Sequence, residues 1–217
     1  MRKLLPVLLL LGLFFASAAV FSNTAMADAA TEKSAARLTL EKSLDEVIAI
    51  LESPDFKNPA KNAPLMQAVK DKIYGICDFQ EFSARTIGGR WRAFTPEQQQ
   101  AFTEAFAELL FETYNSKLLA YDGQQFNFLG ETVSSKGDKV EIRTTIPYDG
   151  KEAAVNYRMI QKDSGWKIYD MIIENIGMVQ NYRNQFQDIL STKTPEDLIA
   201  SIRDKAKETR EKNNAAQ

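Results

Sequence analysis

Residues 91–128 read WRAFTPEQQQAFTEAFAELLFETYNSKLLAYDGQQFNF. The run TPEQ at 95–98 supplies a helix-capping threonine, a first-turn proline and the glutamine of a capping box. Apolar residues then recur at helical spacing, and Phe111 and Leu118 fall on the side opposite Phe102. The second half of this helix is therefore apolar nearly all round. We expect the helix to be covered on two sides or to line an apolar space.

Periodicity divides the rest of the chain into helices and strands. Helical spacing predicts further helices at residues 31–52, 64–75, 78–87, 176–190 and from 195 onward. After Asp122-Gly123, which ends the central helix, alternation predicts strands at residues 124–133, 139–147, 152–162 and 166–174. Short turns join these strands, which is typical of an antiparallel meander. The predicted fold class is α+β, with a strongly curved four-stranded antiparallel sheet wrapped by helices.

Composition excludes several kinds of chemistry. The 217 residues contain no histidine, which excludes Ser-His-Asp and Cys-His nucleophile arrangements and most zinc and iron sites. Cys77 is the single cysteine, so no internal disulfide can form, and we interpret it as a small buried apolar residue. Charges of both signs are mixed along the chain, which does not favour nucleic-acid binding. We expect neither a metal nor a cofactor.

The N-terminus has the pattern of a secretory signal peptide. Two basic residues precede an apolar run at 4–21, and an Ala-Met-Ala cleavage signal follows. A membrane anchor of borderline length is the alternative, but the cleavage signal and a proline within the segment argue against it. We expect cleavage after Ala27. The mature chain, residues 28–217, is then long enough for a single domain, and its polar tail at 205–217 is expected to fray.

Alternation also assigns an inner face to the sheet. The apolar side of the second and third strands carries Val140, Ile142, Ile146, Val155, Tyr157 and Met159. The opposite side carries residues that suit water: Glu141, Arg143, Asn156 and Arg158. We expect the central helix to cover the inner face with Phe106, Leu110 and Tyr114.

The excess of aromatic and aliphatic residues allows two interpretations, a core or the lining of an apolar pocket, because both use the same residue types. Gly88-Gly89 is expected to end the helix predicted at residues 78–87, before Trp91. The residues expected to line a pocket are Phe106, Leu110, Tyr114, Phe126, Phe128, Val140, Ile142, Ile146, Val155, Tyr157, Met159, Trp166, Tyr169, Met171, Met178 and Tyr182.

Charged residues near these positions also have two interpretations each. Asp170 and Glu174, at the end of the last predicted strand, could act as a general base beside an apolar pocket. They could equally cap a helix or pair with Arg183. The arginines at 85, 90 and 92 could hold a phosphate in a fork or simply form a solvated face. The same two readings apply to the Tyr182-Arg183 pair.

Two ordered runs resemble a known family. Residues 77–114, CDFQEFSARTIGGRWRAFTPEQQQAFTEAFAELLFETY, contain an Asp-Phe, an Ala-Arg, an aliphatic-Gly-x-x-Trp and a Thr-Pro-Glu-Gln element in that order. Residues 165–186, GWKIYDMIIENIGMVQNYRNQF, form the second run. Both resemble the toluene-tolerance, or MlaC, family of periplasmic phospholipid-binding proteins. Cys77 departs from the family pattern, in which an aromatic residue is common at this place, and we interpret this as a change in packing.

The resemblance implies a fold, a function and a set of partners. The fold would be a cone like that of nuclear transport factor 2, with an apolar cavity for acyl chains. The function would be that of a soluble, monomeric periplasmic carrier of phospholipid without enzymatic activity. Its partners would be an inner-membrane lipid ABC transporter complex and an outer-membrane lipoprotein–porin complex, and the transfer would maintain outer-membrane lipid asymmetry in a Gram-negative bacterium.

Two alternatives remain open at this point. An isomerase-like or dehydratase-like enzyme could act on an apolar small molecule in the same cavity, with Asp170 and either Tyr157 or Tyr169 as its catalytic pair. A periplasmic chaperone could hold apolar segments of other proteins on the same residues.

Overall fold

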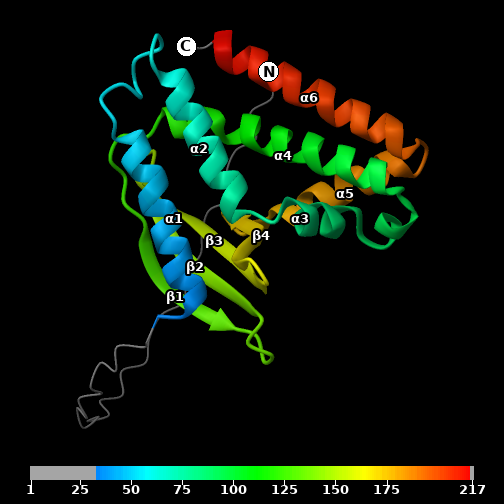
Figure 1. Ribbon diagram of the computed structural model, residues 1–217, viewed down its shortest axis with the longest axis horizontal. Coiled ribbons are helices and arrows are strands. Elements are labelled where there is room, and N and C mark those ends of the chain that lie inside the picture. The colour runs from blue at the N-terminus through cyan, green and yellow to red at the C-terminus, as the bar shows by residue number, and fades with distance from the viewer. Residues whose placement is uncertain (1–32, 216–217) are drawn as a thin grey trace, which may run out of the picture. The chain divides into compact units, whose positions relative to one another are not determined.

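The computed structural model describes residues 33–215, so the expected signal peptide and its cleavage site lie outside the described residues. Among the helices of the described part, none has the length and apolar character that a membrane span requires. Figure 1 shows the elements in chain order: α1 (Ala35–Leu51), α2 (Asn62–Ile76), α3 (Phe79–Ile87), the 3₁₀ helix η1 (Gly88–Ala93), α4 (Pro96–Leu119), β1 (Asn127–Val133), β2 (Lys139–Tyr148), β3 (Lys151–Lys162), β4 (Gly165–Ile173), β5 (Ile176–Gly177), α5 (Met178–Leu190) and α6 (Pro195–Ala215).

The central helix begins as its sequence predicts. The Thr95 hydroxyl accepts a hydrogen bond from the backbone N–H of Gln98 at 3.2 Å, and the Gln98 side chain accepts one from the backbone N–H of Thr95 at 2.8 Å. This reciprocal box satisfies two N–H groups that would otherwise lack partners at the helix start. Residues 105–112 are buried nearly all round, but Tyr114 is 36% exposed, so the enclosed part is the middle of α4.

The sheet is antiparallel with strand order β1-β2-β3-β4-β5. The four predicted strands are confirmed to within a few residues, and the number of strands is corrected from four to five. The missed strand, β5, has only two residues and pairs with the end of β4. It follows a tight turn in which Glu174 and Asn175 both have positive φ. A two-residue strand is too short to show an alternating pattern, so periodicity could not reveal it.

The apolar interior is divided between two main clusters. The sheet cluster consists of residues from the inner face of the sheet packed against Ala36, Leu40 and Leu44 of α1. The helical cluster joins α3, α4, α5 and α6, and it contains Phe106 and Leu110. The prediction that α4 covers the inner face of the sheet is therefore wrong. That position belongs to α1, whose residues Ala36, Leu40 and Leu44 pack in the sheet cluster. Figure 1 shows α1 lying across the strands.

The glycine pair at 88–89 ends α3, as the sequence predicts. Gly88 has φ +66°, a conformation that side chains with a Cβ rarely adopt, and it closes α3 at Ile87. The chain then continues as the 3₁₀ helix η1, which carries Trp91 against the helical cluster. The predicted end of α3 is thus followed by a change of helix type, which presents the Trp91 side chain to the core.

The end of the chain is ordered by contacts with α4, so the expectation of a frayed tail from residue 205 is wrong for the described residues. Helix α6 continues to Ala215 with Ala206 buried. The Arg210 Nε donates to Glu112 Oε1 at 2.8 Å, and the Asn213 side chain donates to the Glu112 carbonyl oxygen at 2.8 Å. Arg210 also pairs with Glu108. The polar sequence at the end of α6 therefore includes residues that attach this helix to α4.

We predict that Arg210→Met lowers the free energy of unfolding by about 2 kcal/mol, because it leaves the buried Glu112 carboxylate without its ionic partner. The matched control is Lys205→Met on the same helix. Lys205 makes only an exposed pair with Glu208, so its loss should cost less than about 0.5 kcal/mol. Urea titration followed by circular dichroism gives both values. Equal effects of the two substitutions would show that the end of α6 is not docked.

Candidate functional site

The six residues predicted for the inner face share one side of the sheet. Val140 lies opposite Met159, and Ile142 lies opposite Tyr157, in the register of β2 and β3. These four are buried in the sheet cluster. Val155 is half-buried against the same cluster, and Ile146 follows on β2 by the same alternation. The prediction of the inner face is therefore confirmed.

The remaining candidate residues divide between the two clusters. Half-buried members of the sheet cluster include Phe126, Phe128 and Trp166. Met178 and Tyr182 pack in the helical cluster with Phe106 and Leu110. Tyr114 belongs to neither cluster, and the same holds for Ile146 and Tyr169. The buried ring of Tyr169 lies 4.2 Å from the guanidinium of Arg85, so it serves a cation–π contact.

Met171 is the candidate that joins the two clusters. It packs against both the sheet cluster and the helical cluster, and it lies opposite Tyr157 in the register of β3 and β4. Ile173, two residues further along β4, packs against the helical cluster and lies opposite Val155. The boundary between the two apolar cores therefore runs along the inner face of β4.

We call this boundary the seam and define it by the exposed Tyr114 and five half-buried residues: Ile146, Val155, Met171, Ile173 and Tyr182. Tyr114 lies close enough to Tyr182 to influence its titration. Burial and, secondarily, this neighbour raise the pKa of Tyr182 to about 12, so its hydroxyl stays neutral. One turn after Tyr114, Lys117 contacts Tyr148, with its ammonium 4.4 Å from the ring, which places the end of α4 beside the end of β2.

Thr144 is a polar residue on the sheet side of the seam, and its hydroxyl already has a hydrogen-bond partner. Thr144, which lies on the inner face between Ile142 and Ile146, is fully buried and donates its hydroxyl to the carbonyl oxygen of Val155 at 2.5 Å. The sequence reading missed both Thr144 and Ile173. Extending the alternation by one step on β2 and β4 would have found them, because each is two residues from a residue that was identified.

Asp170 has a structural role on the opposite side of the sheet. Its Oδ1 accepts from the backbone N–H of Val179 at 3.0 Å, near the start of α5, and from its own following N–H of Met171 at 2.9 Å. Its Oδ2 pairs with Arg158 at 3.1 Å. Arg158 alternates with Tyr157 along β3, so the Asp170 carboxylate and the Tyr157 hydroxyl lie on opposite faces. The catalytic pairing of Asp170 with Tyr157 is thus not formed.

The arginine and glutamate candidates also serve the fold. Arg183 does not pair with Asp170, because its Nε donates to the carbonyl oxygen of Arg85 at 2.9 Å, near the end of α3. Arg90 donates to the carbonyl oxygen of Leu190 at the end of α5. Both arginines satisfy carbonyl groups that lack partners at a helix end. The Glu174 carboxylate accepts from the backbone N–H of Ala154 at 2.5 Å.

Cys77 lies where α2 meets the sheet. It forms a parallel bridge with Ile168 and packs against the sheet cluster. Burial raises the pKa of its thiol to about 12, so the thiolate form is scarce at neutral pH. The interpretation of Cys77 as a packing residue agrees with this position.

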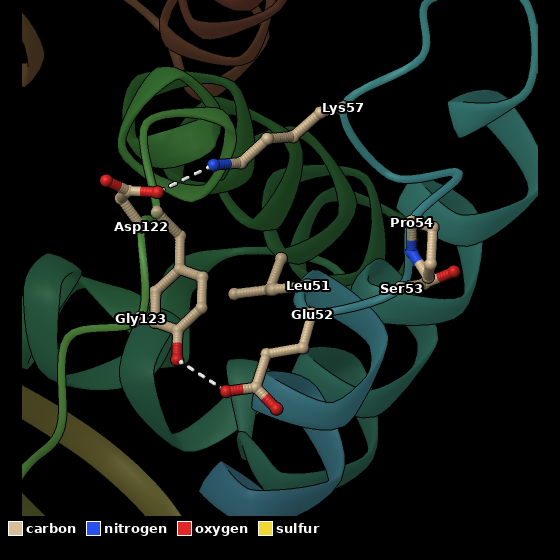
Figure 2. A pocket seen from close by; sticks show the side chains of 8 residues that line it. Leu51, Glu52, Ser53, Pro54, Lys57, Asp122 and Gly123 are labelled. Carbon is tan, nitrogen blue, oxygen red and sulfur yellow. Dashed lines mark hydrogen bonds and ion pairs between the residues drawn. The ribbon is translucent and has the colours of Figure 1, made fainter.

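Neither of two hollows at the surface of residues 33–215 is lined by a candidate residue. The first, of about 320 Å³, lies between the end of α1 and the turn after α4 (Figure 2). Its walls are tied by the Tyr121 hydroxyl, which donates to Glu52 at 3.4 Å, and by the pair of Lys57 with Asp122 at 2.8 Å. The second, of about 430 Å³, lies between α2, α4 and α6.

Comparison with known proteins gives the family. A family model described as "MlaC protein" matches residues 41–204, which is well over half of the 217 residues. This range includes both of the sequence runs, at 77–114 and 165–186, on which the resemblance was based. The chain belongs to the MlaC family.

Individual relatives match over 46% to 80% of this chain. The intermembrane phospholipid transport system binding protein MlaC of Haemophilus influenzae is 19% identical over 171 residues, which cover 77% of this chain and 80% of that protein. The toluene tolerance protein ttg2D of Pseudomonas putida is 27% identical over 100 residues, 46% of each chain. A phospholipid-binding protein of Ralstonia solanacearum, solved in complex with a phospholipid, has a TM-score of 0.73 and 28% identity, and the match covers 80% of this chain and 98% of that one.

We predict that Asp170→Ala lowers the free energy of unfolding by about 2 kcal/mol without changing the amount of phospholipid bound by folded protein. The substitution removes the acceptor near the start of α5 and leaves Arg158 without one of its two carboxylate partners. The exposed Asp188 on α5 provides the control Asp188→Ala, which should change stability by less than about 0.5 kcal/mol. If the Asp170→Ala protein is stable and binds phospholipid normally but no longer supports the protein's function, the enzyme alternative is favoured.

Proposed function

We propose that this member of the MlaC family binds a phospholipid and carries it through an aqueous compartment without chemical change. The observation that carries the proposal is the likeness to the phospholipid complex from Ralstonia solanacearum, whose chain is matched over 98% of its length at a TM-score of 0.73. The family match and the name of the Haemophilus influenzae relative support the same conclusion.

The seam is the proposed site for the acyl chains. Its sheet side offers the apolar side chains of Ile146, Val155, Met171 and Ile173, and the hydroxyl of Thr144 is already bonded. A two-chain lipid has on the order of 30 methylene groups, each worth about 0.8 kcal/mol when removed from water. Apolar side chains without unpaired polar groups are sufficient for this purpose, because the head group can stay in water.

A lipid in the seam would have to separate packed side chains. Met171 packs against both clusters, and none of the six seam residues lines either of the two hollows described above. A lipid would need a space near or above roughly 1,000 Å³, the upper end of ordinary ligand pockets. We therefore propose that acyl chains part the sheet cluster from the helical cluster along Met171, with each cluster keeping its own packing.

The compartment and partners are proposed on the basis of the sequence and the family. The signal-peptide pattern of residues 1–27 favours export, and the proposed compartment is the periplasm. There the protein, acting as a monomer, would exchange lipid with an inner-membrane ABC transporter complex and an outer-membrane lipoprotein–porin complex. Such an exchange would maintain the lipid asymmetry of the outer membrane. The cargo is the only bound group in this proposal, and no cofactor is involved.

We predict that Val155→Asp abolishes co-purification of phospholipid, because a carboxylate in the seam would face acyl chains without a partner at a cost of several kcal/mol. Val155 is better suited than the fully buried Ile142, whose replacement would also damage the core. The control is Arg143→Asp on the exposed side of β2. Lipid per chain is measured by mass spectrometry after solvent extraction, with circular dichroism as the check on folding.

The opposite pattern would contradict the proposal. If Val155→Asp folds and keeps its full lipid content while Arg143→Asp loses lipid, the acyl chains do not lie on the inner face of the sheet.

We also predict that removing the lipid lowers the melting temperature by roughly 5 °C or more. A ligand that binds only the folded state stabilises it by RT ln(1 + [L]/Kd), which is about 2.7 kcal/mol when the ligand is at one hundred times its Kd. Differential scanning calorimetry of loaded protein, delipidated protein and delipidated protein reloaded with phospholipid gives the shift and its reversal. Identical melting curves for all three would argue against an enclosed lipid site.

A further inference from the structure

Two residues that line the hollow between α2, α4 and α6 have side-chain oxygen atoms without a hydrogen-bond partner among the described residues. Glu112 on α4 is only 5% exposed, and its Oε1 is bonded to Arg210. Its Oε2 is buried and has no partner among the described residues, and the same is true of the side-chain oxygen of Asn115, one turn further along α4. Both residues line the hollow. Unpaired buried acceptors are costly and rare in native structures, so a ligand that donates hydrogen bonds is expected here.

The rim of the hollow carries the complementary groups. Lys70 on α2 pairs with Glu108, and Arg210 on α6 pairs with both Glu108 and Glu112. Among the described residues, these bonds use only part of the donors that an ammonium and a guanidinium carry. Free N–H groups therefore remain at the rim, and they suit an oxyanion.

The charges of the hollow cancel. Burial acts to raise the pKa of Glu108, but the hydrogen bonds and charges of Lys70 and Arg210 outweigh it and hold the pKa below its usual value, so Glu108 is ionised. Two cations and two carboxylates then sum to zero. A ligand with no net charge is the best match, provided that its positive end reaches the buried acceptors and its negative end reaches the rim.

The size and the walls of the hollow fit a small molecule. Its volume is about 430 Å³, within the ordinary range of ligand pockets. Met66, Phe111 and Leu119 provide apolar walls that would cover a short carbon chain. The ammonium of Lys70 lies 5.1 Å from the ring of Phe111, which fixes it at the edge of this apolar surface.

We propose that this hollow binds a zwitterion in which a primary ammonium group lies a few bonds from a phosphate, as in an aminoethyl phosphate. The ammonium donates to Glu112 Oε2 and Asn115 Oδ1, and the phosphate accepts from Lys70 and Arg210. The site is separate from the seam, because no seam residue lines it. Arg210 also lies beyond residue 204, where the match to the MlaC family ends. The site therefore depends on a part of α6 outside that match.

The test compares two probes that differ only at nitrogen. Isothermal titration calorimetry of the mature full-length chain is performed with phosphoethanolamine and with phosphocholine. Three methyl groups remove every N–H donor from the second probe. We expect phosphoethanolamine to bind and phosphocholine to bind at least about tenfold more weakly. Equal binding of the two probes overturns the proposal. Absence of phosphoethanolamine binding at about 10 mM also overturns it, because the Kd would then be larger than about 10 mM.

Matched variants locate the binding. Glu112→Gln keeps the shape of the side chain and removes its charge, and it should weaken phosphoethanolamine binding by about tenfold or more. The control Glu104→Gln lies on the exposed side of α4 outside the hollow and should have no effect. Because Glu112→Gln also weakens the contact with Arg210, Asn115→Leu serves as a second variant that leaves that contact in place. Unchanged affinity in folded Asn115→Leu protein would overturn the assignment.

Two further arms distinguish the source of the zwitterion and separate this site from the lipid site. Sedimentation with phosphatidylethanolamine vesicles that depends on Glu112 assigns a lipid head group, whereas binding of the soluble probe alone assigns a free metabolite of that chemistry. Both results support a zwitterion site. Val155→Asp should leave phosphoethanolamine binding intact, and Glu112→Gln should leave co-purified phospholipid intact. Loss of both activities in either variant would show that the hollow is not an independent site.

Discussion

The carboxylate of Asp170 holds the sheet and the helices together. It is 3% exposed, and its two oxygens bind Arg158 on β3 and the backbone N–H of Val179 near the start of α5. A buried charge is tolerated only when it is paired and hydrogen-bonded, and here each bond connects a different element. The direction in which the chain leaves β4 and enters α5 is set by this residue. The positions of Met171 and Tyr182, on either side of the seam, follow from it.

The residue after Asp170 is Met171, which connects the two apolar clusters. Met171 faces away from Asp170 and contacts both apolar clusters. A methionine suits this position because its unbranched side chain adapts to irregular surroundings. The sheet keeps α1 as its cover, and the helices α3, α4, α5 and α6 pack on one another. The acyl-chain site that we propose depends on such a boundary, because the chains would lie between layers that remain folded.

Local features were predictable from the sequence, and contacts between distant residues were not. The capping box at 95–98 and the alternation that groups Ile142 with Tyr157 depend on neighbouring residues, so periodicity and spacing were sufficient to identify them. The partner of Asp170 was not predictable, because Arg158 and Arg183 are equally plausible by sequence and only the strand register selects the first. The cover of the sheet was assigned to the wrong helix for the same reason: α1 and α4 both have apolar surfaces, and their sequence patterns do not say which one meets the strands.

The division into two cores has a consequence for the empty carrier. A protein with one continuous core that opens for its cargo exposes much of that core and becomes prone to aggregation. Here most buried side chains belong to the sheet cluster or to the helical cluster, and Met171 packs against both. A lipid that parts the two along the seam would leave most of each cluster packed. The empty carrier that we propose would therefore expose mainly the seam residues to water.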